Sequence, residues 1–237
     1  MFKHNVAIFK FVIAALIMCC TPFRAFTQNP ITGWIFISHT QKLHSKWDLF
    51  LDAQVRSVYK FKDINTLLLR SAINYNLNGN SSFALGYASK NDWEQEDNGT
   101  RFHPEHRVYQ QYLFKTEFGR LQFTGRARYE QRYIRSEDEF LFSQRSRAFV
   151  ACQIPVFAKK DFKKGTYLNF QDEIFLNVFH KNRVNNSFFD QNRILGSLGY
   201  RWSDKIDTEV GYMWWYQREN EGDVSSNVIQ LMITSNF

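Results

Sequence analysis

The chain has 237 residues, with 30 Lys and Arg against 23 Asp and Glu, and aromatic residues make up 17% of it. A predicted leader holds Lys3, Lys10 and Arg24, so the mature chain keeps 27 basic residues against 23 acidic ones, too small an excess for a typical nucleic-acid-binding protein. The mean hydropathy is −0.43. A soluble core poorly explains so many aromatics at negative hydropathy, whereas aromatic girdles around a polar lumen require both.

Residues 1–27 are predicted to be a cleaved signal peptide. A basic start precedes an apolar run at residues 11–20, which is shorter than the roughly 20 residues of a membrane-spanning helix. We expect cleavage after Thr27. The alternative, a lipid-modified Cys19, is disfavoured because the preceding residue is the bulky Met18. The leader predicts export, and no later apolar run approaches 18 residues.

The mature chain shows the period of two that is typical of strands with one apolar and one polar face. In residues 46–59, Trp47 and Leu49 alternate with Asp48 and Asp52, and we interpret the apolar set as facing lipid. The turn at residues 78–81 indicates a hairpin. The remaining strands are expected at about 67–77, 83–89, 105–116, 121–134, 140–154, 166–178, 189–202, 206–217 and 224–237.

These strands predict an all-β protein, a transmembrane antiparallel up-and-down barrel of about ten strands at residues 46–237, with twelve as the alternative. Residues 28–45 form an N-terminal segment with a candidate extra strand at 33–42. Counting that strand would give eleven, whereas single-chain bacterial barrels have even numbers. The polar stretch 90–104 is interpreted as a long external loop.

The last strand predicts the location. Ile229, Leu231, Ile233 and Phe237 lie on one face, and the final residue is aromatic. A C-terminal aromatic after alternating apolar positions resembles the signal by which outer-membrane proteins are inserted. The expected location is therefore the cell outer membrane, with its lipid and its insertion machinery as partners.

A row of charged side chains should face the lumen. On residues 121–134, Arg126, Arg128, Glu130 and Arg132 share the face opposite the apolar side chains. A lumen of about ten strands is narrow, so these charges are expected to pair with carboxylates. The predicted lumen charge network is Arg107, Arg126, Arg128, Glu130, Arg132, Arg145, Arg147, Glu173, Arg193 and Glu209.

Several short motifs carry a family resemblance. EHRVYQQ at 105–111, RARYEQR at 126–132, RSR at 145–147, QNR at 191–193, together with Glu173 and the closing Phe237, resemble the DUF2490 family. The resemblance spans about residues 33–237. It implies an outer-membrane barrel of unknown function, of a type common in the Bacteroidota, and brings no substrate, cofactor or catalytic residue.

Three functions remain open from the sequence. The sequence favours a charge-plugged barrel that acts as a structural or partner subunit, with a larger envelope complex as a candidate partner. The alternative is an arginine-lined constriction, which would make a narrow anion-preferring porin or small-solute channel. A lipid hydrolase or acyltransferase would need a nucleophile such as Ser89 beside His103 or His106, but no hydrolase motif surrounds them. We expect no enzyme, no cofactor and no metal site. Trp214 and Trp215 are interpreted as girdle and lumen residues.

Overall fold

The computed structural model describes residues 31–96, 99–137, 139–158 and 161–237. The predicted signal peptide at residues 1–27 lies outside the described residues. No helix in the described ranges has the length and apolar character needed to cross a membrane.

Eleven strands and two short 3-10 helices, η1 (Tyr59–Phe61) and η2 (Lys181–Arg183), make up the described chain. The strands are β1 (Ile31–His44), β2 (Trp47–Ser57), β3 (Ile64–Asn76), β4 (Ser81–Glu96), β5 (Gly99–Phe118), β6 (Leu121–Ser136), β7 (Glu139–Ala158), β8 (Gly165–Phe179), β9 (Phe189–Ser203), β10 (Ile206–Glu219) and β11 (Gly222–Asn236).

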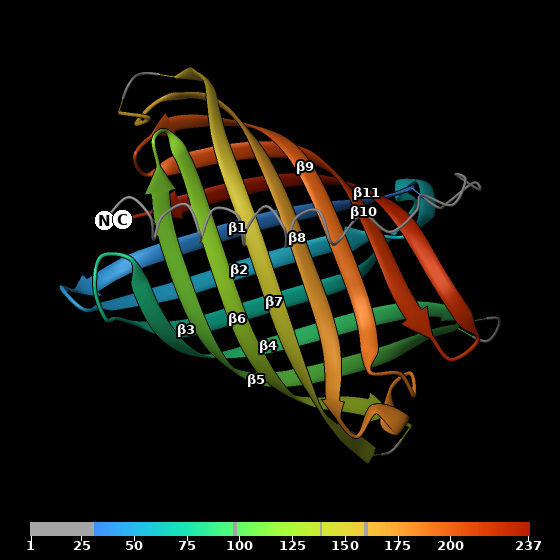
Figure 1. Cartoon of the computed structure of the whole chain (residues 1–237). Coiled ribbons are helices and arrows are strands. Elements are labelled where there is room, and N and C mark those ends of the chain that lie inside the picture. The colour runs from blue at the N-terminus through green and yellow to red at the C-terminus, as the bar shows by residue number, and fades with distance from the viewer. Residues whose placement is uncertain (1–30, 97–98, 138, 159–160) are drawn as a thin grey trace.

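The strands form one closed barrel in which chain neighbours pair antiparallel (Figure 1). The ring closes where β1 pairs with β11 in parallel, from Ile31 opposite Asn227 to Thr40 opposite Asn236. An odd number of strands that alternate in direction must leave one parallel junction. Residues 31 and 237 therefore lie at opposite ends of the barrel.

The all-β barrel predicted from the sequence is confirmed, but its strand count is eleven and not ten. The candidate strand at 33–42 lies within β1, which completes the wall. The even-number rule misled the count because it assumes that every junction is antiparallel. A parallel ladder between the first and last strands satisfies the backbone groups of both edges and removes that restriction.

The expected external loop at residues 90–104 is also wrong, since β4 and β5 pair as strands from Lys90 opposite Glu105 to Glu96 opposite Gly99. Trp93 pairs with Phe102, and their rings lie 5.6 Å apart. Lys90 forms an ion pair with Asp92 on the same strand. Backbone hydrogen bonds hold a ladder whatever its side chains, so a polar stretch can extend a hairpin.

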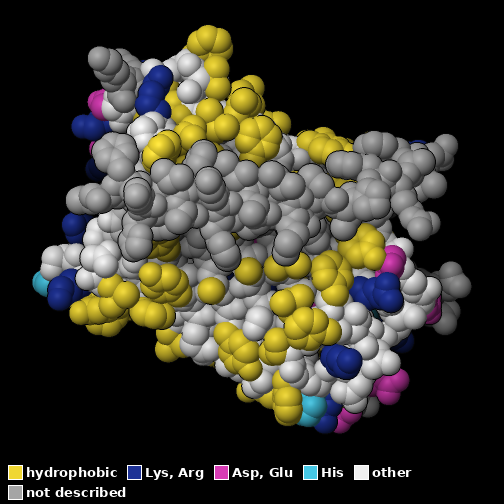
Figure 2. Space-filling view, viewed as in Figure 1, with side chains coloured by type: hydrophobic (Ala, Val, Ile, Leu, Met, Phe, Trp, Pro, Cys, Tyr) yellow, Lys and Arg dark blue, Asp and Glu magenta, His cyan; other side chains and the backbone are white. Residues whose placement is uncertain are grey.

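The wall has an apolar outside and a polar inside. On β2, Leu51 is 42% exposed, whereas Asp52, Gln54 and Arg56 are each at most 8% exposed. Figure 2 shows hydrophobic side chains gathered over the visible outer wall, with charged side chains mainly toward the left and right of the view. Large hydrophobic residues recur on the outside along the chain, including Ile37, Leu85, Leu198, Val210 and Leu231.

Two close approaches inside the barrel depend on glycine. Gly86 lies opposite Tyr109 across β4 and β5, and a Cβ on Gly86 would collide with the tyrosine ring and lie 2.7 Å from the carbonyl oxygen of Ser71. Gly199 and Tyr167 form the same arrangement across β8 and β9. Both tyrosines are at most 1% exposed, so each ring fills the space that its glycine leaves.

Candidate lumen site

The barrel interior encloses a cavity of about 1750 Å³ to which every strand contributes side chains. Its lining includes Thr40 and Asn236, at the end where β11 stops, and Glu94 and Gln217, toward the opposite end. The cavity therefore extends along the barrel between its two ends. Arginine side chains from β2, β3, β5, β6, β7 and β9 line it.

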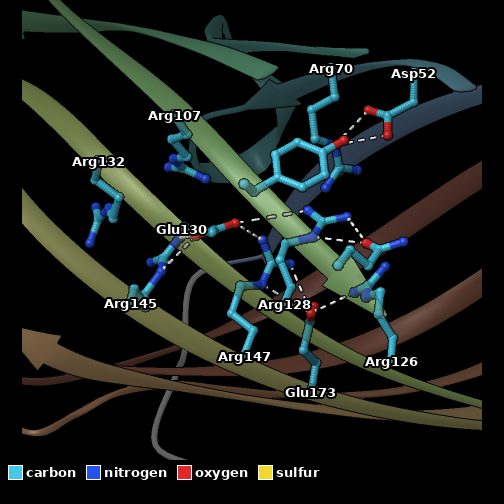
Figure 3. Close-up of polar contacts among 12 residues, drawn as sticks. Asp52, Arg70, Arg107, Arg126, Arg128, Glu130, Arg132, Arg145, Arg147 and Glu173 are labelled. Atoms are coloured by element: carbon cyan, nitrogen blue, oxygen red, sulfur yellow. Dashed lines mark hydrogen bonds and ion pairs between the residues drawn. The ribbon is translucent and has the colours of Figure 1, made fainter. Parts of the chain in front are cut away.

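Glu130 lies at the centre of the charged side chains. This carboxylate is 1% exposed and accepts hydrogen bonds from Arg145 Nε at 3.0 Å, Arg145 Nη2 at 2.7 Å and Arg147 Nη1 at 2.6 Å. Figure 3 shows these side chains pointing toward one another from adjacent strands. Three charge-assisted bonds on one carboxylate make Glu130 the main ionic link between β6 and β7.

Further ion pairs extend from this centre along β8 and β9. Glu173 Oε1 accepts from Arg126 Nη2 at 2.5 Å and from Arg147 Nη2 at 2.8 Å. Asp190 Oδ2 accepts from Arg145 Nη1 at 2.7 Å. Arginines 145 and 147 therefore each bridge two carboxylates and join strands that are not neighbours in sequence.

A second group of pairs is formed by side chains of β2, β3, β5 and β6. Glu105 accepts from Arg107 at 2.8 and 2.7 Å and from Arg132 Nε at 2.6 Å. Arg70 Nε donates to Asp52 Oδ1 at 2.8 Å. Every carboxylate in these groups is at most 8% exposed. Pairing is required at this depth, since an isolated buried charge is costly.

The structure brings most of the predicted network together but separates Glu209 and Arg193 from its ion pairs. Glu209 accepts from Tyr167 Oη, Asn169 Nδ2 and Ser197 Oγ at 3.0, 2.9 and 2.6 Å, in a neutral cluster. Arg128 stays in the network, since its Nη1 lies 3.8 Å from Glu130 Oε1, and it also donates to Gln111 Oε1 at 3.0 and 2.6 Å.

Arg193 Nη2 donates to Gln191 Oε1 at 3.0 Å, and its guanidinium lies among aromatic rings. The alternation of apolar and polar residues predicts that the Arg193 side chain points into the lumen, and we therefore expected it in the ion-pair network. The same alternation does not predict which side chain Arg193 contacts.

The lumen also contains charged residues that the predicted network left out. Asp52, Arg56 and Arg70 lie on the polar faces of two recognised strands, so alternation alone could have included them. Asp190 is different. A bulge lies between Phe189 and Gln191, and it turns the Asp190 side chain inward against simple alternation.

The charges around Glu105, Glu130 and Glu173 do not balance, since nine guanidinium groups lie beside five carboxylates there. Over the whole described lumen the excess is small, because ten arginines and two lysines face eleven carboxylates, including Asp207, beside Arg201, and Glu209. Four buried arginine nitrogens in the described chain lack a hydrogen-bond partner: Arg56 Nε, Arg126 Nε, Arg128 Nη1 and Arg193 Nε. We call the nine arginines the arginine belt: Arg56, Arg70, Arg107, Arg126, Arg128, Arg132, Arg145, Arg147 and Arg193. The five carboxylates are Asp52, Glu105, Glu130, Glu173 and Asp190.

The histidines weighed for catalysis lie away from the belt. Ser89 is paired with His106 across β4 and β5, on the outer wall. His106 Nδ1 hydrogen-bonds Tyr87 Oη at 2.6 Å, while Ser89 Oγ accepts from Asn91 Nδ2 at 3.3 Å. His103 Nε2 lies 3.6 Å from Glu94. Within the described ranges, no group of three or more His, Cys, Asp or Glu side chains is placed to hold a metal ion.

The C-terminal apolar residues lie on the outside of the wall. Ile229, Leu231 and Ile233 are 36–41% exposed, on the face opposite the cavity. Phe237 follows the end of β11, where its N–H donates to Thr40 O at 2.8 Å and its carbonyl accepts from Lys42 N–H at 2.5 Å. The last residue thus extends the pairing between β1 and β11.

Comparison with known proteins identifies the family of this chain. The family described as "Protein of unknown function (DUF2490)" matches residues 31–226, from the first residue of β1 into β11. Neither the comparison with curated proteins nor that with solved structures finds a match. Because the match covers most of the sequence, the chain belongs to the DUF2490 family.

Proposed function

We propose that this protein is exported to the outer membrane and forms a narrow, anion-preferring channel there. The closed wall with its apolar outside supports the membrane location, because such a barrel satisfies every strand edge and presents side chains that lipid accepts. The predicted leader and the C-terminal Phe237 support delivery by the export and insertion machinery.

The observation that carries the channel proposal is the excess of guanidinium groups in the arginine belt over the carboxylates beside them. A plug built only to fill the barrel would pair its charges fully, as buried charge is expensive when unpaired. The arginine belt instead has nine cations beside five carboxylates, and it lines part of a cavity of about 1750 Å³. Rings of basic side chains favour anions, so the belt is suited to pass small anionic solutes.

A structural or partner subunit of a larger envelope complex is the second candidate. The ion pairs of Glu130, Glu173 and Glu105 favour it, because they connect strands β5 to β8 along the wall and stiffen it. This role needs no open path through the barrel.

Conductance across a planar lipid bilayer separates the two candidates. Purified protein should give steady unitary currents in symmetric potassium chloride. A silent bilayer, with correctly folded protein that co-purifies with a larger envelope complex, would overturn the channel and support the structural role.

A channel requires no catalytic residue, so we propose that the protein has no enzyme activity. Micellar phospholipid should not be hydrolysed by the purified protein above the rate of its His106→Ala variant. Hydrolysis that this substitution abolishes would overturn the non-enzymatic assignment and indicate a lipid hydrolase at the outer wall.

A further inference from the structure

One part of the arginine belt has no carboxylate partner and lies against tryptophan. The guanidinium carbon of Arg56 is 3.8 Å from the ring centroid of Trp34, and that of Arg193 is 5.1 Å from the same ring. Arg193 also lies 4.9 Å from the ring of Trp215. Four side chains from β1, β2, β9 and β10 therefore meet at one place on the lumen wall, and all four line the cavity.

The two arginines are held by neutral side chains. Arg56 Nη2 donates to Gln54 Oε1 at 2.8 Å, and Arg193 Nη2 donates to Gln191 Oε1 at 3.0 Å. Gln191 Oε1 also accepts from Trp215 Nε1 at 3.2 Å, so one amide positions a cation and an indole. A glutamine orients a guanidinium without neutralising it, and neither Arg56 nor Arg193 forms a direct ion pair with a carboxylate of the described residues.

Arg56 is only 6% exposed, and its Nε has no hydrogen-bond partner among the described residues. Arg193 Nε is also buried and has no hydrogen-bond partner among the described residues. Their distances to the Trp34 ring, 3.8 and 5.1 Å, place the two guanidinium carbons no more than 8.9 Å apart. One anionic group between them could accept hydrogen bonds of about 2.8 Å from both, which would offset their mutual repulsion.

The wall beside the two arginines is apolar. Trp34 packs with Leu195, Met213, Val228 and Met232, each at most 7% exposed. Trp34 and Trp215 meet edge to face at 5.0 Å. Two cations next to an aromatic and thioether surface match an organic anion that carries a flat apolar body, better than they match a bare inorganic ion.

We infer that Arg56 and Arg193, with Trp34 and Trp215, form a binding site in the lumen for small aromatic carboxylates. The inference rests on the proposed channel, because it names the class of solute that the channel would take. The carboxylate would lie beside the two guanidinium groups. The ring would pack on Trp215, because Trp34 is 4% exposed and already contacts Arg56 at 3.8 Å. The site borders the ion-paired part of the belt, because Arg193 lies 4.7 Å from the Phe175 ring that Arg145 and Arg147 also contact.

Equilibrium binding to the whole folded barrel in detergent micelles tests the site without requiring conduction. Benzoate is the probe, with tryptophan fluorescence as one readout and calorimetry as the second. We expect saturable binding of benzoate. Benzyl alcohol, which lacks the charge, and acetate, which lacks the ring, should each bind at least about tenfold more weakly, since a charge-assisted pair or a buried ring is worth that factor.

Two variants and one control locate the binding. Arg193→Gln and Arg56→Gln should each weaken benzoate binding by about tenfold or more. Arg218→Gln is the matched control, because Arg218 is exposed and pairs with Asp223 at 2.9 Å, away from the lumen site. This control should bind as the parent does. Circular dichroism and heat-dependent gel mobility establish that each variant is folded.

The outcomes separate this site from the channel. Unchanged benzoate affinity in folded Arg193→Gln, or equal binding of benzyl alcohol, would overturn the site. Inorganic phosphate that binds as well as benzoate would overturn the aromatic part of the inference. A barrel that binds benzoate but stays silent in a bilayer would overturn the channel alone, whereas a conducting barrel with no benzoate affinity would overturn the site alone.

Discussion

Replacing Glu130 by Gln should destabilise the barrel more than the same Glu-to-Gln substitution at an exposed position near a turn. Glu130 accepts three hydrogen bonds of 2.6–3.0 Å from Arg145 and Arg147, and it is 1% exposed. The amide keeps the size of the side chain but removes the negative charge, which leaves the buried guanidinium groups of Arg145, Arg147 and Arg128 less compensated.

The expected loss in the free energy of unfolding depends on the ion pairs that Arg145 and Arg147 keep after the substitution. Breaking a buried ion pair costs about 3–5 kcal/mol when the remaining charge has no other partner. Arg145 keeps Asp190 at 2.7 Å, and Arg147 keeps Glu173 at 2.8 Å. The loss in free energy of unfolding should therefore lie near the lower limit, at about 3 kcal/mol.

Urea unfolding of the barrel in lipid vesicles, followed by tryptophan fluorescence, measures this loss. Glu117→Gln is the control, because Glu117 is exposed near a turn and accepts one hydrogen bond, from Gln122 at 2.8 Å. The control should stay within about 0.5 kcal/mol of the parent, as surface substitutions usually do. Equal unfolding midpoints for the two variants would refute the view that the lumen ion pairs hold the wall together.

Three further predictions test the wall itself. Gly86→Val should cost about 1–3 kcal/mol in the same unfolding assay, because the new side chain would overlap Tyr109; a parent-like midpoint would contradict the close approach. Val210→Arg on the outer wall should cost about 2–4 kcal/mol in vesicles, whereas Leu43→Arg at a strand end should cost about 1 kcal/mol or less, and equal costs would argue against a lipid-facing band. Deleting Phe237 should lower the amount of folded barrel in isolated outer membranes, and unchanged levels would contradict its role in insertion.

Much of the barrel could be predicted from the sequence because a strand with one face in lipid must alternate. Residues 121–134 illustrate this, since the inward directions of Arg128, Glu130 and Arg132 follow directly from the period of two, and all three are buried in the lumen. The clearest strand, at 46–59, likewise corresponds to β2.

The remaining features depend on information that a period of two does not contain. Whether β1 completes the wall depends on a parallel pairing with β11, almost two hundred residues away. Asp190 points inward because of a bulge, and Glu209 bonds to Tyr167, Asn169 and Ser197 and not to an arginine. Such contacts are set by strand register around the barrel, so residue type and local spacing do not determine them.

The reversal potential across a bilayer with a gradient of potassium chloride tests the central claim most directly. An arginine belt with nine cations beside five carboxylates should pass chloride in preference to potassium, and the reversal potential should shift toward the chloride equilibrium potential. Arg193→Glu should reduce that shift. A reversal potential on the potassium side, or one that this substitution leaves unchanged, would contradict an anion-preferring lumen.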